Sequence, residues 1–447
     1  MAEHPLPAED LKAIARDIFA HALADCSIDR AFERKLHTAD NRLILDGVDI
    51  VALDRLKRLR ILSIGKAGSV LLTSLLSRLR LPPVCEVRGV LIAPSPPNNL
   101  PDAIRFFPGG HPLPNQASFA GASAALSMLH ALHPTSEDDT LCIFLISGGA
   151  SAMMELPLDP TISLGDTIAF HQILVHCGAS IVEINCIRKH FSAVKGGRLA
   201  LAAGSARQIS LLVSDVAPAY LDALASGPTI ADPTTIAQCR EIIARYKLQE
   251  RFPPSVRSFF ASPALPETPK PADLTSRSWK LLDSDELARA AHHYASSLGF
   301  HTVIDTTCDD WSYTDAAAFL LNRLREIRRD HPRACLISTG EISVQVPAST
   351  KSAAGGRNQH CALHLATQLL PSDAPLAILS VGSDGIDGNS PAAGAVVDTG
   401  TLNGNEKAAQ QALAAFDSYP FLDLLGATIV TGPTGHNLRD LRILLAT

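Results

Sequence analysis

Several features are scarce in this chain of 447 residues, and each scarcity excludes a class of protein. The nine cysteines are odd in number and form no C-x-x-C pair, which argues against a disulfide or zinc framework and for reduced thiols. Basic residues number 39 against 45 acidic ones, so the chain lacks the positive surface that nucleic acid requires. No stretch of about 20 residues is free of charge, and the acidic, amphipathic N-terminus is unlike a signal peptide. We therefore expect a cytoplasmic protein with neither a nucleic-acid nor a membrane partner.

Two familiar nucleotide-binding motifs are also missing. Residues 65–66 are a Gly-Lys pair, but Arg60 stands where a Walker motif has its first glycine. No strand is followed by G-x-G-x-x-G with an acid about twenty residues further on. The chain is thus neither a P-loop protein nor a typical nicotinamide-binding one.

The composition and the order of elements predict an α/β protein. Hydrophobic residues make up 46% and charged residues 19% of the chain, and its length suggests two domains. Strands alternate with helices in the first half, which predicts a Rossmann-like, doubly wound parallel sheet in residues 1–262. Prolines crowd into the stretch that follows, so we expect a linker at residues 263–277. A second, smaller mixed α/β domain is expected over residues 278–447.

The stretch at residues 141–156 has the pattern of an anion site. An uncharged run, typical of a strand buried on both faces, ends in Ser147, Gly148, Gly149 and Ser151, after which a helical pattern begins. Glycines let the backbone approach a phosphate, and the N–H groups of a helix start point toward it. A tight turn without a ligand is the alternative.

Cations stand in two similar glycine turns. Lys66 lies between two glycines, and Arg357 follows two glycines, each at an expected helix start where a positive charge opposes the helix dipole. Such placement favours contact with an anion, although a solvated turn lysine is the alternative for Lys66. Arg188 and Lys195 belong to a basic patch over residues 183–200, which is either an anion site or a solvated basic face.

Acidic residues follow three of the expected strands. Asp215 lies at a strand end, where it is a candidate metal or hydroxyl ligand or else a helix cap. Asp384 and Asp387 share a glycine-rich turn that suits Mg²⁺ together with phosphate oxygens, or that is an ordinary turn. Glu341, after Gly340, follows the third strand. His111, in a loop rich in glycine and proline, is interpreted as an ordinary hydrogen-bonding group.

Taken together, these turns resemble the class II glycerate kinases, the glycerate 2-kinase family with a C-terminal MOFRL domain. The motifs that carry the resemblance run from about residue 61 to the C-terminus, and their ordered set is more specific than any one of them. They are SIGKAG, GGHPLPN, ISGGASA, EINCIRKHFSAVKGGRLA, SDV, ASGPT, STGE, GGRNQ, SDGIDG with AAGAVVD, and TGPTGHN. The resemblance implies Mg²⁺-dependent transfer of the ATP γ-phosphoryl group to the 2-hydroxyl of D-glycerate. It also implies two α/β domains with the active site in the interdomain cleft, and it marks Lys66 and Arg357 as the catalytic cations.

The resemblance and the turns together define the expected site. Asp384 is expected to act with the two catalytic cations, as a magnesium ligand or by orienting the substrate hydroxyl. The expected nucleotide-binding residues are Ser147, Gly148, Gly149, Ser151, Gly340 and Glu341; the substrate-binding residues are Lys66, Arg188, Lys195 and Arg357; the metal ligands are Asp384, Asp387 and Asp215.

The chain also departs from the family pattern. His360 replaces an acid after GGRNQ, residues 389–391 read Asn-Ser-Pro, and His436 interrupts the last glycine turn. Two other functions remain open, a nicotinamide-dependent hydroxypyruvate reductase and a non-catalytic regulator that binds sugar phosphates. The sequence leaves the oligomeric state open, a homodimer included.

Overall fold

The structure, a computed structural model, describes residues 10–132, 139–347, 350 and 353–447. The chain forms two compact units, which we describe separately. The central unit is Ile28–Leu281, and the terminal unit joins the chain up to Ser27 with Leu282–Thr447. None of the described helices is long and apolar enough to cross a membrane.

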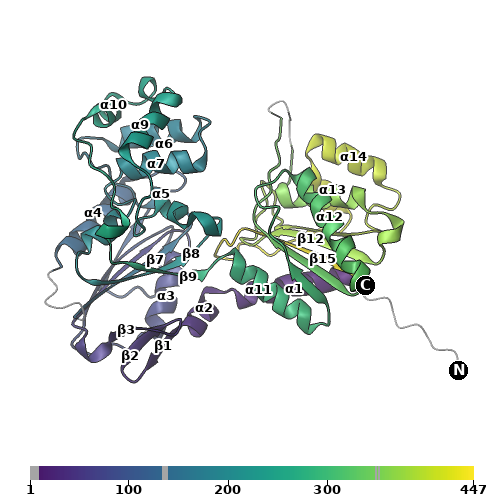
Figure 1. Cartoon of the computed structure of the whole chain (residues 1–447), viewed down its shortest axis with the longest axis horizontal. Coiled ribbons are helices and arrows are strands. Elements are labelled where there is room, and N and C mark those ends of the chain that lie inside the picture. The colour runs from purple at the N-terminus through teal and green to yellow at the C-terminus, as the bar shows by residue number, and fades with distance from the viewer. Residues whose placement is uncertain (1–9, 133–138, 348–349, 351–352) are drawn as a thin grey trace. The chain divides into compact units, whose positions relative to one another are not determined.

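The central unit is built on a six-stranded sheet with the order β6-β5-β4-β7-β8-β9 (Figure 1). Its strands are β4 (Arg58–Ile64), β5 (Glu86–Ala93), β6 (Ile104–Pro108), β7 (Thr140–Ser147), β8 (Arg207–Val213) and β9 (Arg277–Leu282). β4 pairs in parallel with both β5 and β7, as do β5 with β6 and β7 with β8. This order confirms the predicted doubly wound sheet. The direction of winding reverses between β4 and β7, where open sheets bind ligands beyond their carboxyl ends.

Burial explains why β7 lies at the centre. All eight of its residues are buried, as expected for a strand that is covered by helices on both faces. On one face, the apolar side chains of the sheet pack with those of α4 (Gln116–His130), α5 (Ala150–Met153) and α8 (Arg198–Ala202). Helix α3 (Gly68–Arg78) also packs against β4, β5 and β7.

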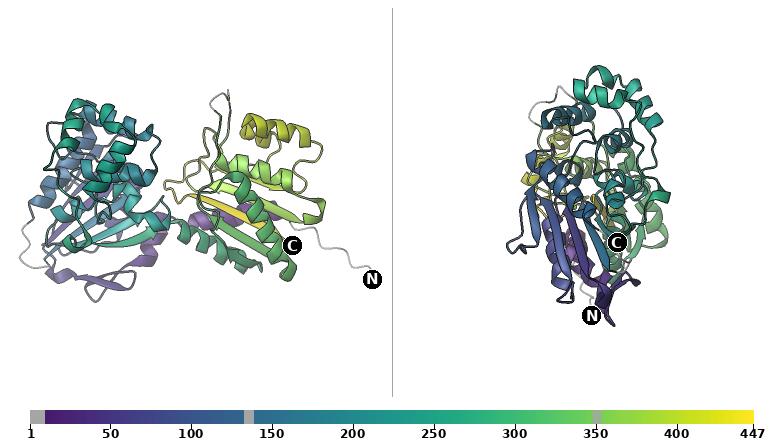
Figure 2. Two further views of the ribbon diagram at one scale, coloured as in Figure 1. Left: turned by 45° about the horizontal axis from the view of Figure 1, so that its top comes forward. Right: turned by 90° about the vertical axis from the view of Figure 1, so that its left-hand side faces the viewer.

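Two smaller assemblies complete the central unit. Helices α6 (Leu164–Val175), α7 (Ile181–Phe191), α9 (Ile236–Arg245) and α10 (Pro254–Ala261) form their own core around five phenylalanines and gather at one end of the unit (Figure 2). Helix α2 (Ile28–Lys35) precedes an antiparallel sheet of β1 (Leu36–Ala39), β2 (Arg42–Leu45) and β3 (Val48–Ala52).

The terminal unit is a mixed sheet with the order β10-β11-β15-β12-β13-β14. Its strands are β10 (His301–Ile304), β11 (Ala334–Thr339), β12 (Leu376–Gly382), β13 (Gly394–Asp398), β14 (Thr428–Ile429) and β15 (Asp440–Ala446). Only β10 and β11 pair in parallel among these strands. Helices α1 (Leu11–Asp25) and α11 (Ser284–Ser297) cover one face, and α12 (Tyr313–Asp330) and α13 (Arg357–Gln368) the other. Helices α14 (Glu406–Ala415) and α15 (Ser418–Leu424) pack next to α13.

The units differ from the predicted domain boundaries at three elements: α1, the predicted linker and β9. Helix α1, expected in the first domain, packs against α11 and β12 of the terminal unit. The stretch predicted as a linker packs on the central unit, since Leu265 is buried in the core of the four helices and Thr268 bonds to Asp232. β9, expected to open the second domain, is instead the edge strand of the first sheet. Prolines therefore mark an irregular but packed segment.

Candidate active site

The turns after β4 and β7 are tied together at the point where the winding of the central sheet reverses. The backbone N–H of Lys66 donates to the carbonyl of Gly148 at 2.9 Å, and the N–H of Ala67 donates to the hydroxyl of Ser147 at 3.1 Å. We call residues 147–151 the glycine turn. These bonds hold it next to the Lys66 turn, at the carboxyl edge of the sheet.

Close contacts explain both glycines of the turn. A Cβ on Gly148 would lie 2.0 Å from Oδ2 of Asp215, which follows β8. Gly149 has φ of +81°, and a Cβ there would lie 3.1 Å from both Lys66 Cγ and His111 Cδ2. The turn therefore gathers one cation, one carboxylate and one imidazole. Burial, followed by the charge of Lys66, lowers the pKa of His111, so this imidazole is neutral at pH 7.

A chain of hydrogen bonds leads from the glycine turn to helix α7. The hydroxyls of Ser151 and Ser226 are 2.8 Å apart, and Ser226 donates to Oδ1 of Asn185 at 3.0 Å. Arg188 lies about one turn further along α7. Burial lowers the pKa of this half-buried guanidinium, against the effect of Glu155, and its Nε finds no hydrogen-bond partner among the described residues. An incompletely paired guanidinium is suited to an anionic ligand.

Lys195, predicted to bind substrate, lies in the core instead. Its Nζ donates to Glu155 at 2.6 Å and to the carbonyl of Met154 at 3.3 Å, and Glu155 is also 2.8 Å from Nε2 of His171. Burial would raise the pKa of Glu155, but Lys195 and His171 lower it to about 2. Lys195 is 0% exposed, so a substrate contact does not fit its position. The ammonium group of Lys195 binds Met154 and Glu155 and so fixes the segment that follows α5.

The terminal unit contains a cavity of about 920 Å³, the carboxylate cavity. It is formed around the residues that follow β11 and β12, the start of α13 and the start of β15. Five acidic residues line it: Asp310, Glu341, Asp384, Asp387 and Asp440. Burial raises the pKa of Glu341, with a further contribution from Asp440, as expected where acidic groups crowd together.

Arg357, predicted as a catalytic and substrate-binding cation, lines this cavity with its charge already paired. Its Nε and Nη2 donate to the two oxygens of Asp440 at 2.6 and 3.0 Å, and Nη2 also lies 2.9 Å from Glu341. This bidentate pairing raises the pKa of Arg357 despite burial, which acts to lower it. Arg357 therefore holds two carboxylates in place.

The two aspartates of the glycine-rich turn after β12 are separated by the fold. The carboxylate of Asp387 is buried and accepts the N–H groups of Asn358 and Gln359 at 3.1 and 2.8 Å. It thus caps α13, whose own Gly356 has no side chain to do so. Asp384 is half-buried at the cavity wall, and its Oδ1 accepts the N–H of Ile386 at 3.1 Å.

The carboxylates of the cavity are the kind of ligand that a hard divalent cation takes, but among the described residues no three of them bring their oxygens within 4.8 Å of one another. Glu341, Asp384 and Asp440 offer carboxylate oxygens, which Mg²⁺ prefers, and a cation would offset their mutual repulsion. Gly340 allows the chain to turn next to Glu341. Its φ is +105°, and a Cβ at this position would lie 2.4 Å from Oδ1 of Asp309. The same oxygen of Asp309 accepts the backbone N–H of Glu341. Asp387 is already used by the backbone of α13, so it fits the metal less well.

The residues that depart from the family pattern have structural contacts. His360 stacks on Phe416, with ring centroids 5.0 Å apart, and burial lowers its pKa to about 4. Asn389 accepts the N–H of Gly355 and donates to the carbonyl of Ala353, both at 2.9 Å. His436 lies 2.8 Å from the carbonyl of Cys26 at the end of α1.

Sequence reasoning missed Asp440, Ser226 and the placement of His111. Asp440 is the first residue of the last buried strand, without a glycine turn to mark it, and Ser226 is an ordinary loop serine. His111 was interpreted as an ordinary loop group, although its Gly-Pro loop follows a strand of the same sheet edge as Lys66. That shared edge is the signal that could have found it.

Comparisons with known proteins agree with this architecture. A family model described as a domain of unknown function (DUF4147) matches residues 14–261, and the MOFRL family model matches residues 334–440. A glycerate 2-kinase of Pyrococcus horikoshii is 31% identical over 452 residues, covering 98% of each chain. The crystal structure of a glycerate kinase from Thermotoga maritima superimposes with a TM-score of 0.82, at 30% identity over 98% of this chain and 99% of that one. A relative from Agrobacterium vitis, which carries the provisional name hydroxypyruvate reductase, is 35% identical over 76% of this chain and 77% of its own length.

The two matched models fall one in each half of the chain, and the relative from Pyrococcus horikoshii matches over nearly its whole length. The chain belongs to the glycerate 2-kinase family with a C-terminal MOFRL domain, and it is a kinase.

Proposed function

We propose that the chain transfers the γ-phosphoryl group of ATP to the 2-hydroxyl of D-glycerate, forming 2-phosphoglycerate and ADP in the cytoplasm. The observation that carries the proposal is the meeting of Lys66, the glycine turn and Asp215 where the sheet changes its winding direction. The names of the relatives support the substrate class, since two of them are glycerate 2-kinases.

The central unit offers groups for each demand of phosphoryl transfer. The glycine turn presents backbone N–H groups at the start of α5, which are suited to phosphate oxygens. Lys66 stabilises the charge that develops on the transferred group, and Arg188 attracts the glycerate carboxylate. Asp215 orients the substrate hydroxyl and accepts its proton as the new oxygen–phosphorus bond forms. Little covalent chemistry is required of the protein, so position and charge account for catalysis.

For Mg²⁺ we favour Asp384 and Glu341 of the carboxylate cavity, with Asp440 next to them. When bound, the ion would neutralise phosphate oxygens and so assist the departure of ADP. Arg357 keeps a place in this proposal as the positioning residue for Glu341 and Asp440. Asp215 remains the alternative ligand in the central unit.

The hydroxypyruvate reductase alternative rests on the name of the Agrobacterium relative. A nicotinamide site built on this sheet would need G-x-G-x-x-G after a strand, and the chain has none. ADP formation with D-glycerate, measured beside NADH oxidation with hydroxypyruvate, separates the two reactions.

The position of phosphorylation needs its own test. Enolase accepts 2-phosphoglycerate but not 3-phosphoglycerate, so we expect enolase to convert the product directly to phosphoenolpyruvate. A product that enolase uses only after phosphoglycerate mutase is added would refute the 2-hydroxyl assignment. Removal of divalent cations with EDTA should abolish turnover, and added Mg²⁺ should restore it.

A further inference from the structure

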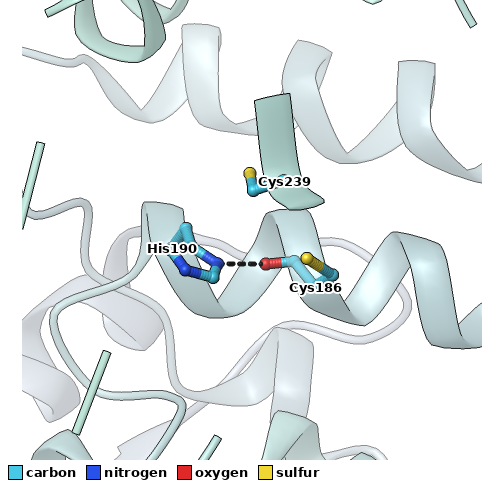
Figure 3. Close-up of side chains that lie close together, drawn as sticks. All are labelled: Cys186, His190 and Cys239. Atoms are coloured by element: carbon cyan, nitrogen blue, oxygen red, sulfur yellow. Dashed lines mark hydrogen bonds between the residues drawn. The ribbon is translucent and has the colours of Figure 1, made fainter. Parts of the chain in front are cut away.

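The described residues bring one group of thiol and imidazole side chains together away from the candidate active site. Cys186 and His190 lie four residues apart on one face of α7, and Cys239 comes from α9, which packs against it (Figure 3). The two sulfurs and a ring nitrogen all lie within 4.8 Å of one another. All three side chains are 0–1% exposed. We call this group the thiol cluster.

We propose that the thiol cluster binds Zn²⁺. Two cysteine sulfurs and one histidine nitrogen are the donor atoms that zinc takes in proteins, and i, i+4 spacing on a helix presents two of them on one side. Burial suits a structural metal, because apolar surroundings exclude competing water.

The environment of His190 supports a ligand role. Its Nε2 lies 2.9 Å from Oε1 of Glu267, and the other oxygen of that carboxylate accepts the N–H of Ile236 at 3.1 Å. A ligating histidine usually bonds a carboxylate through the nitrogen that does not face the metal. Nδ1 lies toward Cys186, 2.8 Å from its backbone carbonyl (Figure 3). To bind zinc through Nδ1, the ring of His190 would have to turn away from this carbonyl, because the 2.8 Å between the two atoms leaves no room for an ion.

Asp232 lies beside the thiol cluster without belonging to it, because its oxygens accept hydrogen bonds from Thr234 and Thr268, and it would become the fourth ligand only by giving these up. It is buried, and its Oδ2 lies 3.9 Å from Nδ1 of His190. Two thiolates, Asp232 and Zn²⁺ carry a net charge of −1. Lys189 offsets this charge, since its Nζ lies 3.3 Å from Asp232.

A metal here would fasten α7 to α9. Helix α7 also carries Asn185, which bonds Ser226, and Arg188. Loss of the metal would therefore loosen the helix that presents Arg188. This consequence rests on the proposed function, whereas zinc binding itself does not.

The test uses the full-length chain, stripped of metal by a chelator and kept reduced. We expect it to bind one Co²⁺ per chain in competition with excess Mg²⁺, with the strong visible and sulfur-to-cobalt charge-transfer bands of a tetrahedral thiolate site. Zn²⁺ should displace Co²⁺ and raise the Tm. These readouts do not depend on glycerate phosphorylation, so failure of the zinc site and failure of the proposed function are distinguishable.

Variants locate the site. Cys186→Ser and Cys239→Ser should each lose the charge-transfer bands and the zinc-dependent rise in Tm. Cys177→Ser, a half-buried cysteine in the same group of helices, should keep both and serves as the matched control. Glu267→Gln should weaken Zn²⁺ binding on the order of 10–100-fold, as expected for a carboxylate behind a ligand.

Three results would overturn the proposal. One is a wild-type chain, folded by circular dichroism, without thiolate-to-cobalt bands. The second is binding that both cysteine variants retain in full. The third is a chain that has no metal affinity and in which mild peroxide treatment reversibly oxidises the thiols of Cys186 and Cys239 to a disulfide.

Discussion

Two lysines near the glycine turn have opposite environments. Lys66 is exposed, and its stem packs on Gly149, whereas Lys195 is 0% exposed and paired with Glu155. A charge that contacts water can be offered to a ligand, while a charge already paired in the core cannot. The two residues should therefore respond differently to substitution.

Lys66→Ala should remove charge stabilisation from the transferred phosphoryl group. We expect kcat to fall by about 100-fold or more, with little change in stability because the side chain is exposed. Steady-state kinetics with D-glycerate and ATP, beside urea unfolding, measure both effects. Lys57→Ala, at another exposed lysine, should change neither. An unchanged kcat in Lys66→Ala would refute the catalytic role.

Lys195→Ala should act on stability. The substitution leaves the buried carboxylate of Glu155 without its main cation, which costs about 3–5 kcal/mol of the free energy of unfolding. Urea unfolding of the variant measures this loss. Lys195→Met combined with Glu155→Gln removes both charges and should recover most of the stability. A normal free energy of unfolding with a raised KM for glycerate would instead restore the substrate role of Lys195.

At the scale of elements, the N-termini of α7 and α13 are capped by residues from different parts of the chain. Helix α7 follows the sequence rule, since Ser180 and Glu183 form a capping box. Helix α13 begins after Gly356 and receives its capping carboxylate from Asp387, thirty positions along the chain from its first residue. The second arrangement ties the position of Arg357 to the turn after β12, so the cap and the carboxylate cavity depend on one another.

Asp387 should make stability depend on pH. Burial raises its pKa to about 6 from 3.8, so between these values the folded chain holds a proton that the unfolded chain has lost. Stability should therefore fall as pH rises from about 4 to about 6, by about 1–3 kcal/mol. Urea unfolding in metal-free buffer, compared with Asp387→Asn, isolates this dependence. If the wild-type chain instead gained stability relative to the variant as the pH rises from about 4 to about 6, burial would not raise the pKa of Asp387 in the folded chain.

At the scale of the whole molecule, the chain crosses between units twice. Helix α1 packs against α11 and β12, so the terminal unit contains both ends of the described chain. Its apolar stripe, with Leu11, Ala15, Ile18, Phe19 and Ala22 all buried, is part of that core. The terminal unit is consequently incomplete without residues that precede the central one.

Ile18→Ala should expose this dependence. The side chain is 0% exposed, so we expect a loss of about 2–5 kcal/mol in stability, with a smaller loss for Ile18→Val. Hydrogen exchange should accelerate in α11 and β12 and stay unchanged in β4, β7 and β8. Faster exchange confined to the central sheet would refute the assignment of α1 to the terminal unit.

Much of the local structure could be predicted from sequence. Buried strands such as β7, the glycine turns that follow them and the parallel first sheet all come from short-range patterns. The side chains that meet at Gly149 follow from the rule that parallel strands share a carboxyl edge. The ion pairs of Lys195 and Arg357 could not be predicted from the sequence, because their acidic partners lie on other elements and nothing in the neighbouring residues indicates them.

The sequence by itself determined the class of fold, the order of its turns and the kinase family, because each depends on local periodicity and on motifs within a few residues. The tertiary structure decided which charges are free, since Lys66 stays exposed while Glu155 and Asp440 pair with Lys195 and Arg357. It also assigned α1 to the terminal unit and brought Cys186 and Cys239 together although no C-x-x-C spacing announces them. Burial selects such partners across long stretches of chain, where the physical constraint is the shared core and not the spacing of residues.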